Sequence, residues 1–495
     1  MSNASGEPEN VDSANSTAVT TGGRSTGILL VLAPVILLVT YVTSMLLPAI
    51  PVIQKDFSAT ATTAAWIVSG FLIVGTGVSP LFGKLGDVYG KKRMILAALL
   101  CFTIGVGLAG FSTSIYMLVL TMAVAGVGYA ILPLALGMVS DLFPKERVAM
   151  MQGVIMATAA IGGTLGLVGG SYVVQTLGWQ YLLYTALVGS VVLVGLAATF
   201  LKETLRSVQT KVDYSGAFTL MGGVALLLAY LSEGQSLGWF SYENLAFLVI
   251  GLLLTACFFV LERGNANPLI QLGLLRVRNV FVANIAGIIA GLVNYLLFFG
   301  FVYYAELTQP FGLGFSILST GLALLPATMA MIVVGPIMGR VVTKNGPKPV
   351  LLTGSSTLVL GMLLFIFNRS SAVGIMTDAV VASIGIVCIL VPIVNMVTSS
   401  LPKENASTGV GINWMLQNLG KSIGPILATV FMTAYTVPLT EAAGGKSVVV
   451  AYLPSSVAFN AIFALGIGFA VVVAIASLAI RNYYFRDQSP TSNSD

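Results

Sequence analysis

One lysine lies deep within an apolar stretch of the chain, where few side chains could pair with it. Lys421 stands in LQNLGKSIGP, 17 residues after Glu404, which is about 25 Å along a helix at 1.5 Å per residue. In a membrane, a cation at that depth costs about 3 kcal/mol and is expected to face a cavity or a partner. Lys421 could bind an anionic group of a substrate, or gain and lose a proton itself. The alternative is a structural cation that binds backbone carbonyls or caps the kink at Gly424-Pro425.

A carboxylate is the second candidate for chemistry. Glu306 ends another apolar stretch, beside Tyr303 and Tyr304. These neighbours favour an interfacial acid among the aromatic residues that mark a membrane boundary. If Glu306 faces a cavity instead, it is the carboxylate best placed for proton coupling or cation binding.

Several polar or amphipathic side chains within apolar stretches could line a central pocket. They are Tyr41, Asn294, Asn395, Asn413, Trp414, Gln417 and Asn418. Hydrogen bonding between neighbouring helices is the commoner use of such residues in membranes. Both interpretations therefore stay open for each residue.

The composition explains why so few residues stand out. Of the 495 residues, 8% are charged and 57% are hydrophobic, whereas ordinary soluble domains have about 25% charged residues. Such a chain cannot cover a water-facing surface, so we predict an all-α polytopic membrane protein whose partner is the lipid bilayer. Histidine is absent, and Cys101, Cys257 and Cys388 lie far apart in apolar stretches. We therefore expect no metal site, no cofactor and no disulfide.

Fourteen apolar stretches, from 27–50 to 455–480, are long enough to cross the membrane, because about 20 apolar residues span its hydrocarbon. With the N-terminus inside, 19 of the 23 Lys and Arg residues fall in cytoplasmic segments and three fall outside. This bias predicts that both termini are cytoplasmic, and it accounts for the formal charge of +5 without a nucleic-acid partner. The polar tails, 1–26 and 486–495, are expected to be disordered.

A polar motif after the second apolar stretch is repeated after the tenth. Residues 83–96 read GKLGDVYGKKRMIL, and residues 339–352 read GRVVTKNGPKPVLL. Glycines at the positions of Gly83 and Gly90 occur in both copies, but the acid Asp87 occurs only in the first. Parallel repeats of this kind are typical of transporters that bind substrate between two halves. They predict six-helix bundles at 27–205 and 266–485, separated by a two-helix insert at 206–265.

The first copy of the motif resembles the signature loop of the major facilitator superfamily. Gly178-Trp179, the DYSG at 213–216 and the stretch 314–326 resemble its fourteen-span drug:proton antiporter branch. The resemblance implies a major facilitator fold with 14 transmembrane helices (6+2+6) in the cell membrane. It further implies a monomeric transporter, not an enzyme, that exports small hydrophobic or amphiphilic compounds by alternating access, coupled to protons.

The resemblance also implies roles in gating. Asp87 would brace the cytoplasmic gate against the start of the thirteenth span, near 406–409, with Arg93 as its countercharge. Gly83 and Gly90 would permit a close helix approach and a tight turn. A ladder of small residues in the fifth span favours close helix packing and, by resemblance, a seal against leak; it comprises Gly153, Gly162, Gly166 and Gly170.

Three positions depart from the family pattern, and two of them remove charges. Val39 stands where span 1 usually carries an acid, Met122 where span 4 usually carries an arginine, and Leu167 where the glycine ladder usually ends in proline. The apolar body of the first six spans contains no Asp or Glu. Two hypotheses therefore stay open: an exporter of amphiphilic compounds, and a permease for an anionic or polar solute, coupled or uncoupled, that uses Lys421.

Overall fold

A computed structural model describes residues 21–143, 145–204, 213–265, 268, 271–443 and 446–480. The first helix begins at Thr21, inside the range predicted as an N-terminal tail. Residues 1–20 and the predicted tail 486–495 lie outside the described residues.

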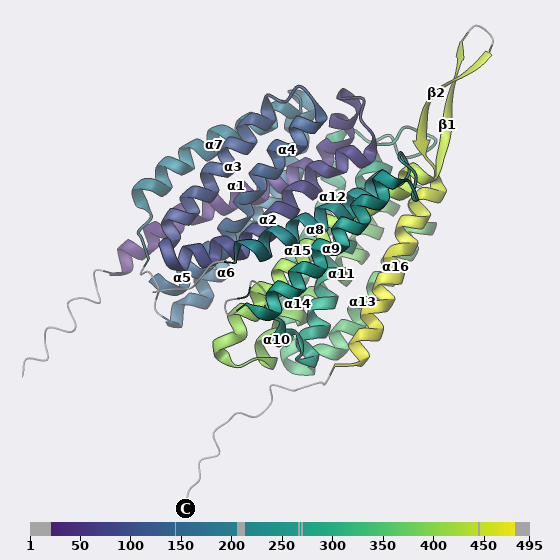
Figure 1. The fold of residues 1–495 in the computed structure, drawn as a ribbon. Helices are drawn as coiled ribbons and strands as arrows, with labels where there is room; N and C mark the ends of the chain where they lie inside the picture. Colours follow the sequence, from purple (N-terminus) through teal and green to yellow (C-terminus); the bar gives the residue numbers. More distant parts are fainter. Residues whose placement is uncertain are drawn as a thin grey trace, which may run out of the picture.

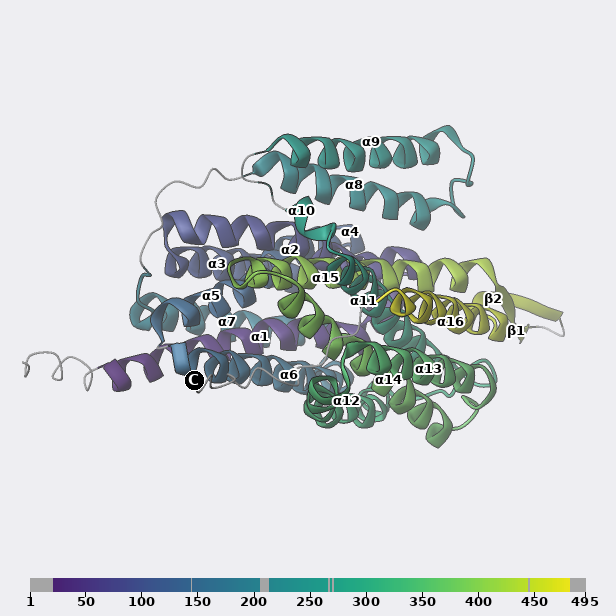
Figure 2. The same ribbon diagram turned by 90° about the horizontal axis from the view of Figure 1, so that it is seen from below.

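Two helical halves lie side by side, with a pair of helices on the outside (Figures 1 and 2). The first half comprises α1 (Thr21–Asp56), α2 (Ala61–Tyr89), α3 (Lys91–Gly110), α4 (Ile115–Ala125), the 3₁₀ turn η2 (Gly126–Ala130), α5 (Ile131–Leu142), α6 (Lys145–Thr176) and α7 (Trp179–Phe200). The insert comprises α8 (Tyr214–Glu233) and α9 (Tyr242–Gly264). The second half comprises α10 (Leu272–Leu275), α11 (Arg278–Glu306), α12 (Ile317–Asn345), α13 (Pro347–Phe367), α14 (Ala372–Ser400), α15 (Lys403–Ala434), β1 (Thr436–Ala443), β2 (Lys446–Pro454) and α16 (Ser456–Leu478).

Within the described residues, thirteen helical segments are long and apolar enough to cross a membrane. One of them, Ile115–Leu142, runs through α4, η2 and α5. The sequence predicts fourteen spans, and the long helix that is missing from the thirteen is α15. It has 32 residues, but its Asn413, Gln417, Asn418 and Lys421 make it much less apolar than its neighbours.

The two copies of the polar motif form sharp turns of the same kind. Gly90 ends α2 and precedes α3 with φ 101°, and Gly346 ends α12 and precedes α13 with φ 82°. Side chains with a Cβ rarely adopt positive φ values, so both turns require glycine. This confirms the tight turn predicted at Gly90. An added Cβ at Gly83 meets nothing within 4 Å, so the close helix approach predicted there is absent.

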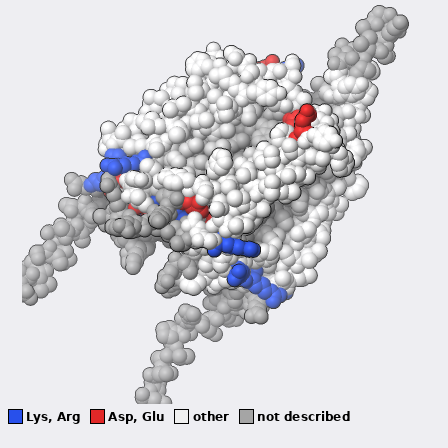
Figure 3. Space-filling model, viewed as in Figure 1, with Lys and Arg blue, Asp and Glu red and all other residues white. Residues whose placement is uncertain are grey.

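We call the end that carries these two turns the motif end, and the opposite end, where β1 and β2 protrude, the hairpin end (Figure 1). On the face in Figure 3, Lys and Arg gather mainly toward the motif end, and a wide uncharged surface lies between the two ends. Such a surface suits contact with lipid.

The halves contact each other at the hairpin end. The Tyr303 hydroxyl of α11 donates to Gln54 Oε1 of α1 at 2.8 Å. The Leu318 N–H of α12 donates to Gln175 Oε1 of α6 at 2.9 Å. Nearby, α12 lies so close to α6 that a Cβ at Gly321 would clash with the Ser171 hydroxyl.

At the motif end, several glycines have free space beside them. Gly83 of α2, Gly153 of α6, Gly339 of α12 and Gly411 of α15 all lie toward this end, and an added Cβ at any of them meets nothing within 4 Å. Hydrogen bonds and close packing therefore join the halves at the hairpin end, whereas these glycines leave room at the motif end.

The glycine ladder of α6 packs directly on α1. An added Cβ at Gly162 or Gly166 would clash with α1, at the Thr40 hydroxyl and at the Tyr41 carbonyl oxygen respectively, and one at Gly170 would lie 2.6 Å from Met45 Cβ. Small residues allow this approach, which gains van der Waals contact that lipid cannot supply.

The insert lies outside the two halves and contacts both (Figure 2). At one end, Trp66 Nε1 of α2 donates to Ser232 Oγ of α8 at 3.1 Å. At the other, Asp213 caps α8 by accepting from the Gly216 N–H at 2.8 Å. Burial alone would raise the pKa of Asp213, but hydrogen bonds from Gly216, Ser215 and Asn265 and the charge of Lys84 lower it below its usual value.

The fold is all-α as predicted, and a single hairpin of β1 and β2 accompanies the helices in the described residues. The strands pair antiparallel from Thr436–Pro454 to Ala443–Lys446. Their residues include a run of valines and two threonines, which favour strands, and the two residues between them are glycines. A Gly-Gly pair between two such runs is a typical hairpin turn.

Gly90, at the turn, and Gly83, which has free space at its Cβ position, form a matched pair of substitution sites in the first motif. We expect Gly90→Ala to lower the free energy of unfolding by about 1–3 kcal/mol, because alanine is strained at φ 101°. Gly83→Ala lies in a helix with free space and should be neutral or stabilising by up to about 1 kcal/mol. Thermal unfolding of the purified protein in detergent measures both. Equal Tm values for the two variants would contradict the role of the turn.

The glycine ladder offers a second matched pair. Gly166→Ala places a methyl group against the α1 backbone, so we expect it to cost about 1–3 kcal/mol by overpacking. Gly153→Ala, on the same helix, meets open space and should leave Tm unchanged or raised. The same unfolding assay distinguishes them. A stable Gly166→Ala variant would show that α1 and α6 are not held together at this position.

Candidate functional site

A cavity of about 200 Å³ lies between the halves. Its walls come from α1, η2, α5 and α6 of the first half and from α15 of the second. The apolar lining residues are Ile36, Val39, Ile131, Leu132, Met156 and Ala159, and those with polar groups are Thr40, Tyr129, Trp414 and Lys421. Concave, mostly apolar sites with a few polar groups are typical of small-molecule binding.

α15 presents two polar faces, and only one of them meets the cavity. Residues 413 and 417 are buried against α11. There Asn413 Nδ2 donates to the Ala283 carbonyl and to Asn284 Oδ1, each at 3.0 Å, and Gln417 Nε2 donates to Asn413 Oδ1 at 2.7 Å. These side chains join two helices, which is the commoner of the two uses considered for them.

The other face of α15 carries Trp414, Asn418 and Lys421, at helical spacings of four and three residues. The Trp414 ring stacks on Tyr129 with centroids 5.3 Å apart and planes 16° apart. The Tyr129 hydroxyl donates to Asn418 Oδ1 at 3.2 Å. Lys421 Nζ lies 6.0 Å from the centroid of the Trp414 ring, within the range of a cation–π interaction.

Lys421 has no ion pair and no hydrogen bond with any of the residues that the structure describes. It lines the cavity, so the cation faces open space between the halves and does not brace carbonyls near Gly424-Pro425. Ser422, next to it, does fix the helix: its carbonyl accepts from the Ser69 hydroxyl of α2 at 2.7 Å.

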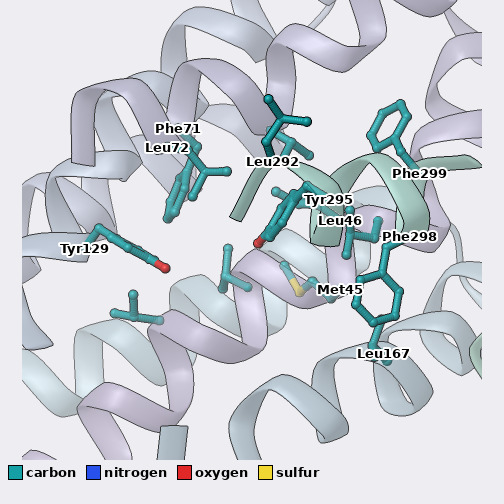
Figure 4. Packing of buried hydrophobic residues seen from close by; sticks show 14 of the residues in the cluster. Met45, Leu46, Phe71, Leu72, Tyr129, Leu167, Leu292, Tyr295, Phe298 and Phe299 are labelled. Atoms are coloured by element: carbon teal, nitrogen blue, oxygen red, sulfur yellow. The ribbon is translucent and has the colours of Figure 1, made fainter. Parts of the chain in front are cut away.

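Tyr129 is a site residue that the sequence analysis missed. Figure 4 shows its hydroxyl and that of Tyr295 directed toward the same space between the halves, among buried apolar side chains such as Leu72 and Met45. Tyr129 lies in η2, the 3₁₀ turn that interrupts the fourth span. The signal was the pair Gly126 and Gly128 in mid-span, since such turns often mark functional positions.

Glu306 lies at the hairpin end, away from the cavity lining. Its carboxyl group lies near the Thr320 side chain of α12, and its Oε1 atom is buried without a partner among the described residues. Tyr303, one turn earlier, forms the contact with Gln54 that joins the halves. The acid is therefore part of the closed end of the molecule.

The remaining pocket candidates are dispersed. The Tyr41 side chain lies near Thr185 of α7 within the first half. Asn395 Nδ2 donates to the Val391 carbonyl of its own helix at 3.3 Å. Asn294 Nδ2, on α11, is buried and has no partner among the described residues. None of the three is among the residues that line the cavity.

The charges of the first motif pair differently from the prediction. Asp87 is half exposed and pairs with Lys91 at 3.4 Å, and Lys91 pairs also with Asp141. Arg93, predicted as the countercharge of Asp87, lies 3.6 Å from Glu203 instead. The sharp turn at Gly90 lies between Asp87 and Lys91 and brings the two side chains together, which makes that pair the local solution. The side chains at 403–408, where Asp87 was predicted to dock, lie outside the described residues.

Curated relatives of this chain are named for drug resistance and export. It is 29% identical over 384 residues to the multidrug resistance protein Stp of Mycobacterium tuberculosis (strain CDC 1551 / Oshkosh), covering 76% of this chain and 70% of that protein. It is 26% identical to the tetracenomycin C resistance and export protein of Streptomyces glaucescens, with 83% and 77% covered.

Solved structures share the fold. The peptide transporter POT in complex with sulfate matches with a TM-score of 0.65 at 15% identity, covering 92% of this chain and 94% of that chain. The nucleoside transporter NupG matches with a TM-score of 0.61 at 15% identity, covering 91% and 99%. The family model of the Major Facilitator Superfamily matches residues 32–425. This chain therefore belongs to the Major Facilitator Superfamily.

Proposed function

We propose that this chain exports small amphiphilic compounds across the cell membrane by alternating access. The observation that carries the proposal is the cavity between the halves, which is lined by apolar walls and Lys421 and closed at the hairpin end by contacts between the halves. The names of the drug-resistance and export relatives support export as the direction.

The proposal includes the topology predicted from the loop charges. α15 completes the set of fourteen spans as the thirteenth in chain order, because α11, α2 and the insert pack around it. The motif end, with most of its basic residues, then faces the cytoplasm, and both termini are cytoplasmic. In that orientation, the structure is an inward-facing conformation, ready to take up a compound from the cytoplasm or the inner leaflet.

The first motif provides the contact that holds the motif end closed in the outward-facing conformation. When the halves close at the motif end, Asp87 comes to the start of α15, whose free N–H groups favour a carboxylate. Asp87 is half exposed and paired only within its own loop in the present conformation, so it is available for that contact. The ladder of Gly162, Gly166 and Gly170 keeps α1 and α6 together as the halves rock.

We further propose that Glu306 couples export to protons. The cavity lining has no acid, and with Lys421 assigned to the substrate we place the proton carrier outside the cavity. Glu306 is a buried acid in the closed end, where the halves must part for release to the outside. A carboxyl group that alternates between a closed gate and water can exchange one proton in each cycle.

Cross-linking the hairpin end tests alternating access. In a variant whose three cysteines are replaced by alanine, Gln175→Cys and Leu318→Cys place two thiols across the contact of α6 with α12. A short bifunctional thiol reagent should reduce export from proteoliposomes at least tenfold, and a reducing agent should restore it. Gln175→Cys alone is the control. Unchanged export at full cross-linking would contradict alternating access.

A conservative substitution tests the coupling. In Glu306→Gln, we expect an imposed pH gradient to stop accelerating export, while substrate exchange without a gradient continues. Glu243→Gln, at the exposed start of α9, is the control and should respond like the wild type. Gradient-driven export by Glu306→Gln would remove the role of this acid. A wild type that ignores the gradient at every pH would favour the uncoupled permease.

A further inference from the structure

We propose that the compounds held in the cavity are amphiphilic organic anions, whose acidic group binds Lys421 and whose apolar or aromatic body lies along the walls. This inference rests on the proposed transport function and adds the class of substrate. It follows from the charge, the hydrogen-bonding groups and the shape of the site.

The charge of the lining is positive and uncompensated. Lys421 is the one charged residue among the described residues that line the cavity. It has no ion pair or hydrogen bond with another described residue. A charge removed from bulk water and left without a partner is costly. A ligand that brings a carboxylate, sulfonate or phosphate group supplies the missing partner, and a charge-assisted hydrogen bond with it.

A second polar group near Lys421, the amide of Asn418, also has a donor without an acceptor. Asn418 precedes Lys421 by three residues on the same face of α15 and is 1% exposed. Its Oδ1 atom accepts from the Tyr129 hydroxyl, whereas its Nδ2 atom has no partner among the described residues. Asn418 is not among the residues that line the cavity, so the direct partner that the site offers to an acidic group is the ammonium group of Lys421.

The rest of the site suits a flat or aliphatic body. Trp414 and Tyr129 form a stacked pair, and Trp414 extends one face of α15 toward Lys421. On the first half, Val39, Leu132 and Met156 complete an apolar wall. A ligand that places its acidic group at Lys421 can therefore bury its body against both halves.

The positive charge of Lys421 also disfavours cationic ligands. A lipophilic amine would meet Lys421 at short range with no carboxylate in the lining to offset the repulsion. The aromatic pair could attract an ammonium group, but that interaction is worth about 0.5–2 kcal/mol and is already used by Lys421. A neutral compound would leave the lysine unpaired, so we expect the order anion, neutral compound, cation.

Three probes with one naphthalene body separate these classes: 2-naphthylacetate, 2-naphthylacetamide and 2-(2-naphthyl)ethylamine. Quenching of tryptophan fluorescence of the full chain in lipid nanodiscs gives Kd, and proteoliposomes give export. We expect the acetate to bind at least tenfold more tightly than the amide, and the amine to bind most weakly. Wild type that binds the amine as tightly as the acetate would overturn the inference.

Substitutions assign the preference to the lysine. Lys421→Gln should bring the acetate to the affinity of the amide while changing the amide itself less than threefold, and Lys421→Arg should keep the preference. Lys344→Gln removes an exposed lysine at the motif end of α12 and should change neither. A preference for the acetate that survives in Lys421→Gln would refute the assignment. Export of the amide or amine but not the acetate would refute the substrate class alone. The absence of export for all three probes, and for the drugs of the relatives, would refute the transport function.

Discussion

A polar helix must cross an apolar solvent, and much of this structure follows from that constraint. α15 carries Asn413, Gln417, Asn418 and Lys421 within about two turns, and none of these groups can face lipid cheaply. Each face of the helix is therefore covered by protein. α11 covers the side that carries Asn413 and Gln417. The first half, through α2 and η2, lies on the side that carries Asn418 and Lys421.

The same constraint gives the insert a physical role. Ile412 and Met415 of α15 form one buried cluster with Leu220 of α8 and Phe258 of α9. The insert thus shields a third side of α15 from lipid, toward the motif end of that helix. Since α8 also contacts α2, it spans the seam between the halves. A six-plus-six arrangement without the insert would expose this part of α15 to lipid whenever the motif end opened.

The sequence predicted the elements whose cause is local. The turn at Gly90 and its copy at Gly346 could be predicted because only glycine tolerates that backbone. The position of Lys421 deep within an apolar stretch was enough to predict that it faces a cavity or a partner. Pairs between residues distant in sequence could not be predicted. Arg93 pairs with Glu203, and the spacing within the motif gave no indication of this partner. The side of α15 that each amide faces depends on α11. Tyr129 became a site residue only through its contact with Trp414.

The positions of the two ionisable candidates constrain how coupling can work. Lys421 lines the cavity, whereas Glu306 lies in the closed hairpin end, near Thr320 of α12. A proton on Glu306 therefore cannot compete with a substrate for the same group. On the proposed assignment of Glu306 to the proton, coupling passes through the conformation, with each ligand favouring one arrangement of the halves. α11 is suited to carry it, since it bears Glu306 at its end and packs along α15, close to Lys421, at Gly291. A transporter built in this way can separate the chemistry of its substrate from that of its driving ion.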